Sequence, residues 1–120
     1  MSETTVGARR FVVDVHQDGG HWTATARCAD TGEPFGPPLT AGSAAAAEQR
    51  LTRWLQWQHD HAHAIAVLQE AERAYHRLVA ERAFAVLPDD AVTESARRSS
   101  LHDVETARRL LDAIRATRPG

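Results

Sequence analysis

A line of residues through the middle of this chain recurs at spacings that alternate between three and four. Such spacing keeps one stripe of a long helix against a partner. Polar residues interrupt the stripe, and we expect specificity or a binding site at those positions. Its members are Leu51, Trp54, Gln58, His61, Ile65, Leu68, Glu72, Tyr75, Val79, Arg82 and Val86.

One uninterrupted helix over residues 43–87 is predicted to carry this stripe. Ser43 suits the N-cap position, because its hydroxyl accepts a hydrogen bond from a backbone N–H of the first turn. Pro88 ends the helix, since proline lacks the N–H that the next turn needs. We expect Leu51–Leu55 to cover the strands and the later part, Ile65–Val86, to meet a second helix.

Before this helix the apolar residues recur every second position, which indicates strands. One strand places Phe11, Val13 and Val15 on a single face. The next places Trp22, Ala24, Ala26 and Cys28 on a single face after a glycine turn. A two-residue loop of Asp18-Gly19 or of Gly19-Gly20 brings the two apolar faces together, so either register supports a hairpin.

The remaining N-terminal segments are predicted to be peripheral. Residues 1–8 are small and polar and are expected to form a flexible start. Leu39–Ala41 is a possible short edge strand, while the residues before it cannot form a central strand because proline donates no hydrogen bond to a sheet. These prolines are Pro34, Pro37 and Pro38.

The C-terminal part is predicted to be a helix over 100–118, after a connection over 88–99. Ser100 and Asp103 resemble a capping box with aspartate in place of glutamate. Residues 89–98 fit either helix or loop. The last helix should fold back antiparallel onto the first, using Leu101, Val104, Leu111 and Ile114.

Together these elements predict an α+β fold in the order β-β-α-α. An N-terminal β-hairpin head over 9–42, with a possible third edge strand, packs on a long helix. That helix forms an antiparallel helical hairpin with the C-terminal helix. The 120 residues are expected to form a single domain, 1–120, with a modest core.

Composition narrows the class of protein. The chain is 42% hydrophobic and 25% charged, as in ordinary globular domains. It has no apolar run that could span a bilayer, and its single Cys28 suits a reducing compartment, so we expect a cytoplasmic protein with no membrane partner. All 14 basic residues are arginine, which suggests a bacterial, GC-rich coding bias.

Protein partners are the leading expectation for the polar positions of the stripe. Polar residues on a helical seam commonly fix register or partner number. Two tryptophans three residues apart add either core packing or an exposed binding residue. The candidate partner-binding residues are Trp54, Trp57, Gln58, His61, Glu72, Tyr75 and Arg82.

Two further sites are alternatives. His59 and His63 are four residues apart, the spacing of two metal-binding histidines on one helical face, although the sequence assigns no third ligand. The last 30 residues carry six arginines against four acidic residues, so this segment alone is mildly basic. A nucleic-acid surface would use Arg97, Arg98, Arg108 and Arg109.

Phe11–Val15, Gly19–Trp22 and Leu39–Ser43 lead into an alanine-rich helix. In this order of elements, the segment from Phe11 to Trp54 resembles the small β-β-β-α antitoxin modules of the HicB type. The resemblance implies an antitoxin-like or nucleic-acid-associated regulator. The long helices have no counterpart in that module.

The function expected from the sequence is a small non-enzymatic protein that oligomerises or docks a partner. It would act through the long helix and the exposed edge of the sheet, most simply as a homodimer. No nucleophile–base pair or acid–base pair can be assembled from the spacing of the residues, so no enzyme and no cofactor is predicted.

Overall fold

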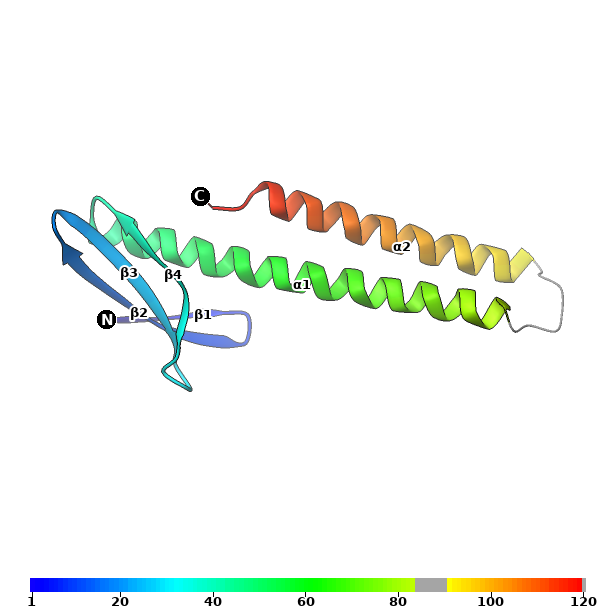
Figure 1. The fold of residues 1–120 in the computed structure, drawn as a ribbon, viewed down its shortest axis with the longest axis horizontal. Coiled ribbons are helices and arrows are strands. Elements are labelled where there is room, and N and C mark those ends of the chain that lie inside the picture. Colours follow the sequence, from blue (N-terminus) through cyan, green and yellow to red (C-terminus); the bar gives the residue numbers. More distant parts are fainter. Residues whose placement is uncertain (84–90, 120) are drawn as a thin grey trace. The chain divides into compact units, whose positions relative to one another are not determined.

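The computed structural model describes residues 1–83 and 91–119. Over these residues the chain forms one antiparallel sheet followed by two helices, which confirms the α+β prediction (Figure 1). The sheet has four strands, where the sequence predicted two and a possible third. The predictions for Val86, Leu87 and Pro88 lie outside the described residues. The elements are β1 (Ser2–Val6), β2 (Arg9–Asp18), β3 (His21–Cys28), β4 (Pro34–Ala41), α1 (Ala44–Ala83) and α2 (Ala91–Ala116).

Residue contacts divide the chain into two compact units. Unit 1 comprises Met1–His59 and the end of the chain from Arg118. It holds the sheet and the first part of α1. Unit 2 comprises Asp60–Thr117, which is the rest of α1 and α2.

The strands of unit 1 lie in the order β1-β2-β3-β4, and each pairs antiparallel with its neighbours. The β2–β3 hairpin turns at Gly19-Gly20, so Asp18 lies opposite His21 and Phe11 opposite Cys28. This is one of the two registers that the sequence allowed. Gly19 and Gly20 have φ angles of 57° and 90°, which glycine adopts without steric cost.

The core of unit 1 lies between the sheet and the first turns of α1. Ala24 is fully buried and Ala26 is 3% exposed, so the small side chains of β3 leave space for the helix. The ring of Phe35 lies 5.0 Å from that of Phe11 and 6.1 Å from that of Trp54. The buried core residues are Val6, Phe11, Val13, Ala24, Ala26, Ala47, Leu51 and Leu55.

The N-terminus differs from the prediction of a flexible start at residues 1–8. It forms β1, in which Thr4 lies opposite Phe11 and Val6 opposite Arg9. Val6 is 4% exposed, while Thr5 next to it is exposed. The alternation that marks a strand was therefore present, but it contained one large apolar residue and gave little signal.

The predicted edge strand at Leu39–Ala41 is present and begins earlier, at Pro34. Prolines are tolerated there because β4 is an edge strand, whose outer N–H groups need no partner in the sheet. Gly36 has a φ of 78°, and a Cβ atom at this position would lie 2.5 Å from the Trp54 ring. Glycine is therefore required both for the backbone conformation and for the packing of Trp54.

The start of α1 follows the prediction. The backbone N–H of Ala46 donates to the Ser43 hydroxyl at 3.1 Å, and the N–H of Ala47 donates to the Ser43 carbonyl at 3.0 Å. These are the bonds of an N-cap, which satisfies donors that the helix itself leaves unpaired. The sequence therefore fixes this helix start locally.

Unit 2 is an antiparallel helical hairpin in which α2 lies beside the later part of α1 (Figure 1). His61 of α1 contacts Arg115 near the end of α2, and Tyr75 of α1 lies near Arg97 close to the start of α2. These two pairs show that the helices run in opposite directions. The buried residues of the hairpin are Ala64, Ser100, Val104, Ala107 and Leu111.

The C-terminal helix begins at Ala91, nine residues before the predicted start at residue 100. Ser100 is only 9% exposed and lies inside the helix, so it is no cap. Glu94 pairs with Arg97 at 2.7 Å and with Arg98 at 3.4 Å, and such pairs at i,i+3 and i,i+4 support helix formation in the segment left ambiguous.

In unit 2, the residues of α1 that face α2 differ in phase from the stripe that the sequence predicted. Val79 is 41% exposed, whereas Leu78 beside it is half-buried. Ala64 is 1% exposed and is more buried than Ile65. The contact line therefore follows His61, Ala64, Leu68, Ala71, Tyr75 and Leu78. Small residues on this line match Ser100 and Ala107 of α2, because small side chains let two helices approach closely.

Candidate protein-interaction surfaces

The sheet of unit 1 has two edges, and they differ in chemistry. At one edge, β1 pairs with β2 and with no other strand of the described residues. Its residues contain no proline, so every backbone N–H on the outer side is able to donate. A strand whose outer N–H and C=O groups have no partner in the sheet offers a template for another strand. We call Ser2–Val6 the open edge.

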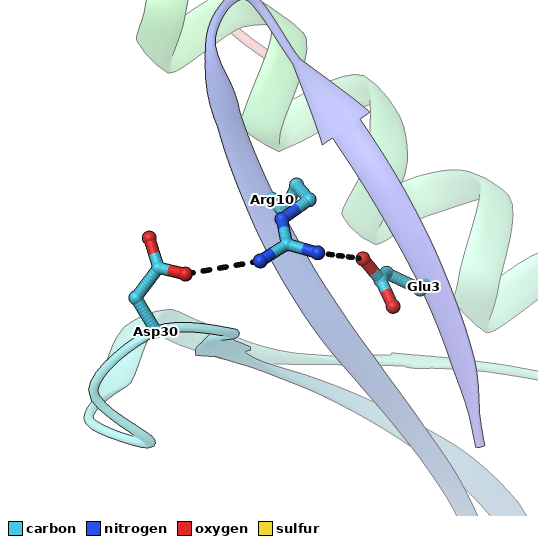
Figure 2. Close-up of polar contacts among 3 residues, drawn as sticks. All are labelled: Glu3, Arg10 and Asp30. Atoms are coloured by element: carbon cyan, nitrogen blue, oxygen red, sulfur yellow. Dashed lines mark hydrogen bonds and ion pairs between the residues drawn. The ribbon is translucent and has the colours of Figure 1, made fainter.

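Arg10 of β2 forms two ion pairs beside the open edge. One guanidinium nitrogen of Arg10 lies 3.5 Å from the Glu3 carboxylate of β1, and another lies 3.1 Å from Asp30, in the turn after β3 (Figure 2). All three side chains are more than half exposed. Exposed pairs stabilise a fold little, but they set the charge pattern of this face.

The opposite edge is β4, and proline blocks much of it. Pro34, Pro37 and Pro38 are three of its eight residues, and each lacks a backbone N–H. Pairing with β3 also shifts register between Ala24 and Ala26. Irregular, proline-bearing edges resist the addition of another strand.

A shallow groove of about 660 Å³ lies on the first part of α1. Glu48 lines it and also accepts a 2.6 Å hydrogen bond from the hydroxyl of Ser2 in β1. The groove therefore borders the open edge. Its lining residues are Ala45, Glu48, Gln49, Thr52 and Arg53.

Unit 2 carries a second shallow groove, of about 470 Å³, between α1 and α2. Three of its seven lining residues are alanine, and the carboxylates of Glu70 and Asp103 flank them. Arg73 donates a 2.8 Å hydrogen bond to Glu70 and lowers the pKa of that carboxyl. The lining residues are Ala66, Val67, Glu70, Ala71, Ala74, Ser100 and Asp103.

The two candidate tryptophans have different surroundings in unit 1. Trp54 packs against the core, next to Phe35 and Gly36. Trp57 is half-buried, and the guanidinium of Arg118 lies 5.4 Å from the centre of its ring. This is the range of a cation–π interaction. Trp54 is therefore chiefly a core residue, and Trp57 keeps a partly open face.

Gln58 and His61 are both half-buried, Gln58 in unit 1 and His61 in unit 2. Arg115 donates a hydrogen bond from Nε to the His61 Nε2 atom, at 3.3 Å. This contact needs His61 to be unprotonated at Nε2, because a protonated nitrogen cannot accept. Arg115 belongs to the mildly basic last segment of the chain, and in the structure it contacts this histidine.

The other candidates on the stripe lie in unit 2. Glu72 and Tyr75 are half-buried. Glu94 raises the pKa of Arg97, and Tyr75 makes a smaller contribution to that shift. Arg82 lies in the last turn of α1, and its side chain is outside the described part of the chain.

Three of the four arginines proposed for nucleic acid pair with acidic residues of α2. Arg97 and Arg98 both contact Glu94, and Arg109 lies 3.8 Å from Glu105. Arg108 is exposed. The Arg-rich surface is thus largely balanced within the helix, and its binding to nucleic acid stays a prediction.

The histidines proposed for a metal are both exposed. His59 lies against the β1–β2 turn, where a Cβ atom on Gly7 would collide with its ring. His63 belongs to unit 2. Among the described residues, no group of three or more His, Cys, Asp or Glu side chains is placed to hold a metal ion.

The open edge was not predicted from the sequence, because residues 1–8 were expected to be flexible. Ser2–Val6 contains two threonines and a valine, residues that favour strands, but the segment is short and mostly polar. The spacing of Thr4 and Val6 at every second position is the strand signal in this segment.

Comparison of this chain with protein-family models, with curated proteins and with solved structures found no match. Over the residues that the structure describes, neither helix combines the length and the apolar character needed to cross a bilayer.

Proposed function

We propose that this chain is a non-enzymatic protein-binding module that pairs with another protein along β1. One observation carries the proposal, namely the unpaired and proline-free edge at Ser2–Val6. Strand addition at such an edge supplies main-chain hydrogen bonds for affinity and side-chain contacts on alternate residues for specificity.

The contrast between the two edges supports this proposal. Proline removes donors along β4, and the same protection is missing from β1. The open edge carries one charged residue, Glu3, and no lysine or bulge that would discourage pairing. The partner strand is therefore expected at β1 and not at β4.

Each unit also carries a groove of its own that a protein partner could contact. The groove on α1 borders β1, so a strand added there has neighbouring space for its side chains. In unit 2, Val67 lines the groove and is 38% exposed. Exposed apolar side chains beside a groove favour contact with protein.

Two proline substitutions test the proposal. Backbone N–H groups of successive strand residues point to opposite sides, so Thr4→Pro and Thr5→Pro remove donors from opposite sides of β1. One variant loses a bond to β2 and unfolds more easily. The other keeps its stability and loses its protein partner, which is recovered from the native host with the wild-type chain.

Hydrogen exchange gives the direct readout. In the complex, the outward amides of Ser2–Val6 should exchange more slowly than in the free chain, because they become donors to the partner strand. Unchanged exchange over these residues on partner binding contradicts the proposal. Equal recovery of partner by the wild type and by both proline variants contradicts it as well.

A further inference from the structure

We propose that the partner strand at β1 is the β1 strand of a second copy of this chain. Two sheets would then join about a two-fold axis into one antiparallel sheet of twice the width. This inference rests on the proposed function, since it names the occupant of the same edge. It is argued from the register, the charges and the surface beside the edge.

Face alternation restricts the register first. The inner face of β1 carries Thr4 and Val6, opposite Phe11 and Arg9 of β2, and the outer face carries Glu3 and Thr5. Inner residues must meet inner residues across the axis, because a slip by one residue turns every side chain to the wrong face. The axis must therefore pass through a residue and not between two residues.

The number of paired residues and their charges then determine the residue at which the two-fold axis passes. An axis at Thr4 pairs all of Ser2–Val6, with Ser2 opposite the partner's Val6 and Glu3 opposite the partner's Thr5. An axis at Glu3 would set two carboxylates directly opposite each other, which destabilises a strand pair. An axis at Thr5 would pair fewer residues of the strand. The geometry selects Thr4.

The register at Thr4 is also complementary in charge. Thr5 lies opposite Arg10 within the sheet, so the partner's Glu3 would lie on the far side of Thr5 from Arg10. Strands are about 4.8 Å apart, which puts Arg10 and the partner's Glu3 about 10 Å apart at their Cα atoms, within reach of the two side chains. Arg10 already forms ion pairs with Glu3 and Asp30 of its own chain on this exposed face (Figure 2).

The area that the two copies bury against each other limits the affinity of the dimer. Stable interfaces bury at least about 1,200 Å² in total, and a short strand pair alone falls below this. The groove beside Glu48 borders β1 and adds contact area for the partner's side chains. We therefore expect a weak dimer whose population rises with protein concentration.

Disulfide trapping tests both the occupant and the register. In a Cys28→Ser background, Thr4→Cys places two thiols opposite each other across the axis, and mild oxidation should link the chains. Thr5→Cys is the matched control, because the two Thr5 Cα atoms would lie about 8 Å apart, beyond the reach of a disulfide. A mixture of Glu3→Cys and Thr5→Cys chains should link, since these positions lie opposite each other.

Analytical ultracentrifugation of the unmodified full chain completes the test. A mass that doubles with rising concentration, together with trapping by Thr4→Cys and not by Thr5→Cys, supports the proposal. Equal trapping at both positions overturns the register. A strict monomer that Thr4→Cys fails to link overturns the dimer, while slowed exchange of the β1 amides by a different protein would leave the proposed function standing.

Discussion

Arg115 of α2 donates a hydrogen bond to the Nε2 atom of His61 in α1, at 3.3 Å. The two residues are 54 positions apart in the chain, so this contact joins the helices of unit 2 directly. It also places a cation beside one of the polar residues of the helical stripe. The contact gives His61 a structural partner within its own unit.

Arg115→Ala should weaken unit 2 by a small amount, about 0.5 kcal/mol, because one solvent-exposed hydrogen bond is lost. Thermal unfolding followed by circular dichroism measures the change. Arg108→Ala is the matched control, since Arg108 is an exposed arginine of the same helix. An equal effect of both substitutions would show that helix propensity, and not the contact with His61, is responsible.

Gly36→Ala should destabilise unit 1 more than Gly32→Ala. The two glycines have similar φ angles, 78° and 74°, so both variants carry the same backbone penalty of about 1–2 kcal/mol. Only at Gly36 would the new Cβ atom meet the Trp54 ring, at 2.5 Å, whereas nothing lies within 4 Å at Gly32. Overpacking adds about 1–3 kcal/mol.

Urea unfolding of the two glycine variants, followed by tryptophan fluorescence, measures this difference. A larger loss for Gly36→Ala confirms that Trp54 packs on β4. Equal losses would place Trp54 away from this strand.

Leu111→Ala should cost about 2–4 kcal/mol, because it removes a side chain from the core of unit 2 and leaves a cavity. Leu111 is 4% exposed, while Leu110 beside it is 48% exposed. Leu110→Ala should therefore change stability by less than about 0.5 kcal/mol. Chemical unfolding of both variants measures the contrast, and similar losses would mean that α2 faces α1 with a different side.

Arg73→Ala should raise the pKa of Glu70, which the Arg73 guanidinium lowers through a hydrogen bond and through its charge. The folded-state pKa lies below the unfolded one, so this pair stabilises the fold at high pH. The contribution is lost as the pH falls through the folded-state pKa. Carbon-detected NMR titration of the Glu70 carboxyl measures the shift.

Arg77→Ala provides the control for this titration. Arg77 lies 3.8 Å from Glu70 and contributes less than Arg73 to the lowered pKa. The Arg77 variant should therefore shift the Glu70 pKa less than the Arg73 variant does. The reverse order would show that the ion pair at i,i+3 does not persist in solution.

Local patterns predicted the parts of the fold that depend on neighbouring residues. The β2–β3 hairpin follows from alternation and from Gly19-Gly20, and the start of α1 follows from the capping chemistry of Ser43. The start of α2 was missed because Ser100 looks like a cap. It is buried instead, because the small side chain suits close helix packing, and only the tertiary structure reveals this.

The sequence predicted the type of candidate site, an exposed sheet edge, but not the strand that forms it. The sequence indicated an exposed sheet edge and polar residues on a helical stripe, and no pattern showed that Ser2–Val6 pairs with β2. Long-range partners decide such features. His61 with Arg115, and Trp57 with Arg118, are contacts between residues far apart in the sequence, and neither spacing nor composition indicates them.

The prolines of β4 have a consequence for how far assembly proceeds. A sheet with two competent edges can add copies at both ends and grow into a ribbon or fibre. In the described sheet β1 carries no proline, whereas Pro34, Pro37 and Pro38 remove backbone donors from β4. Once two copies join at β1, both outer edges are β4, and growth terminates by itself.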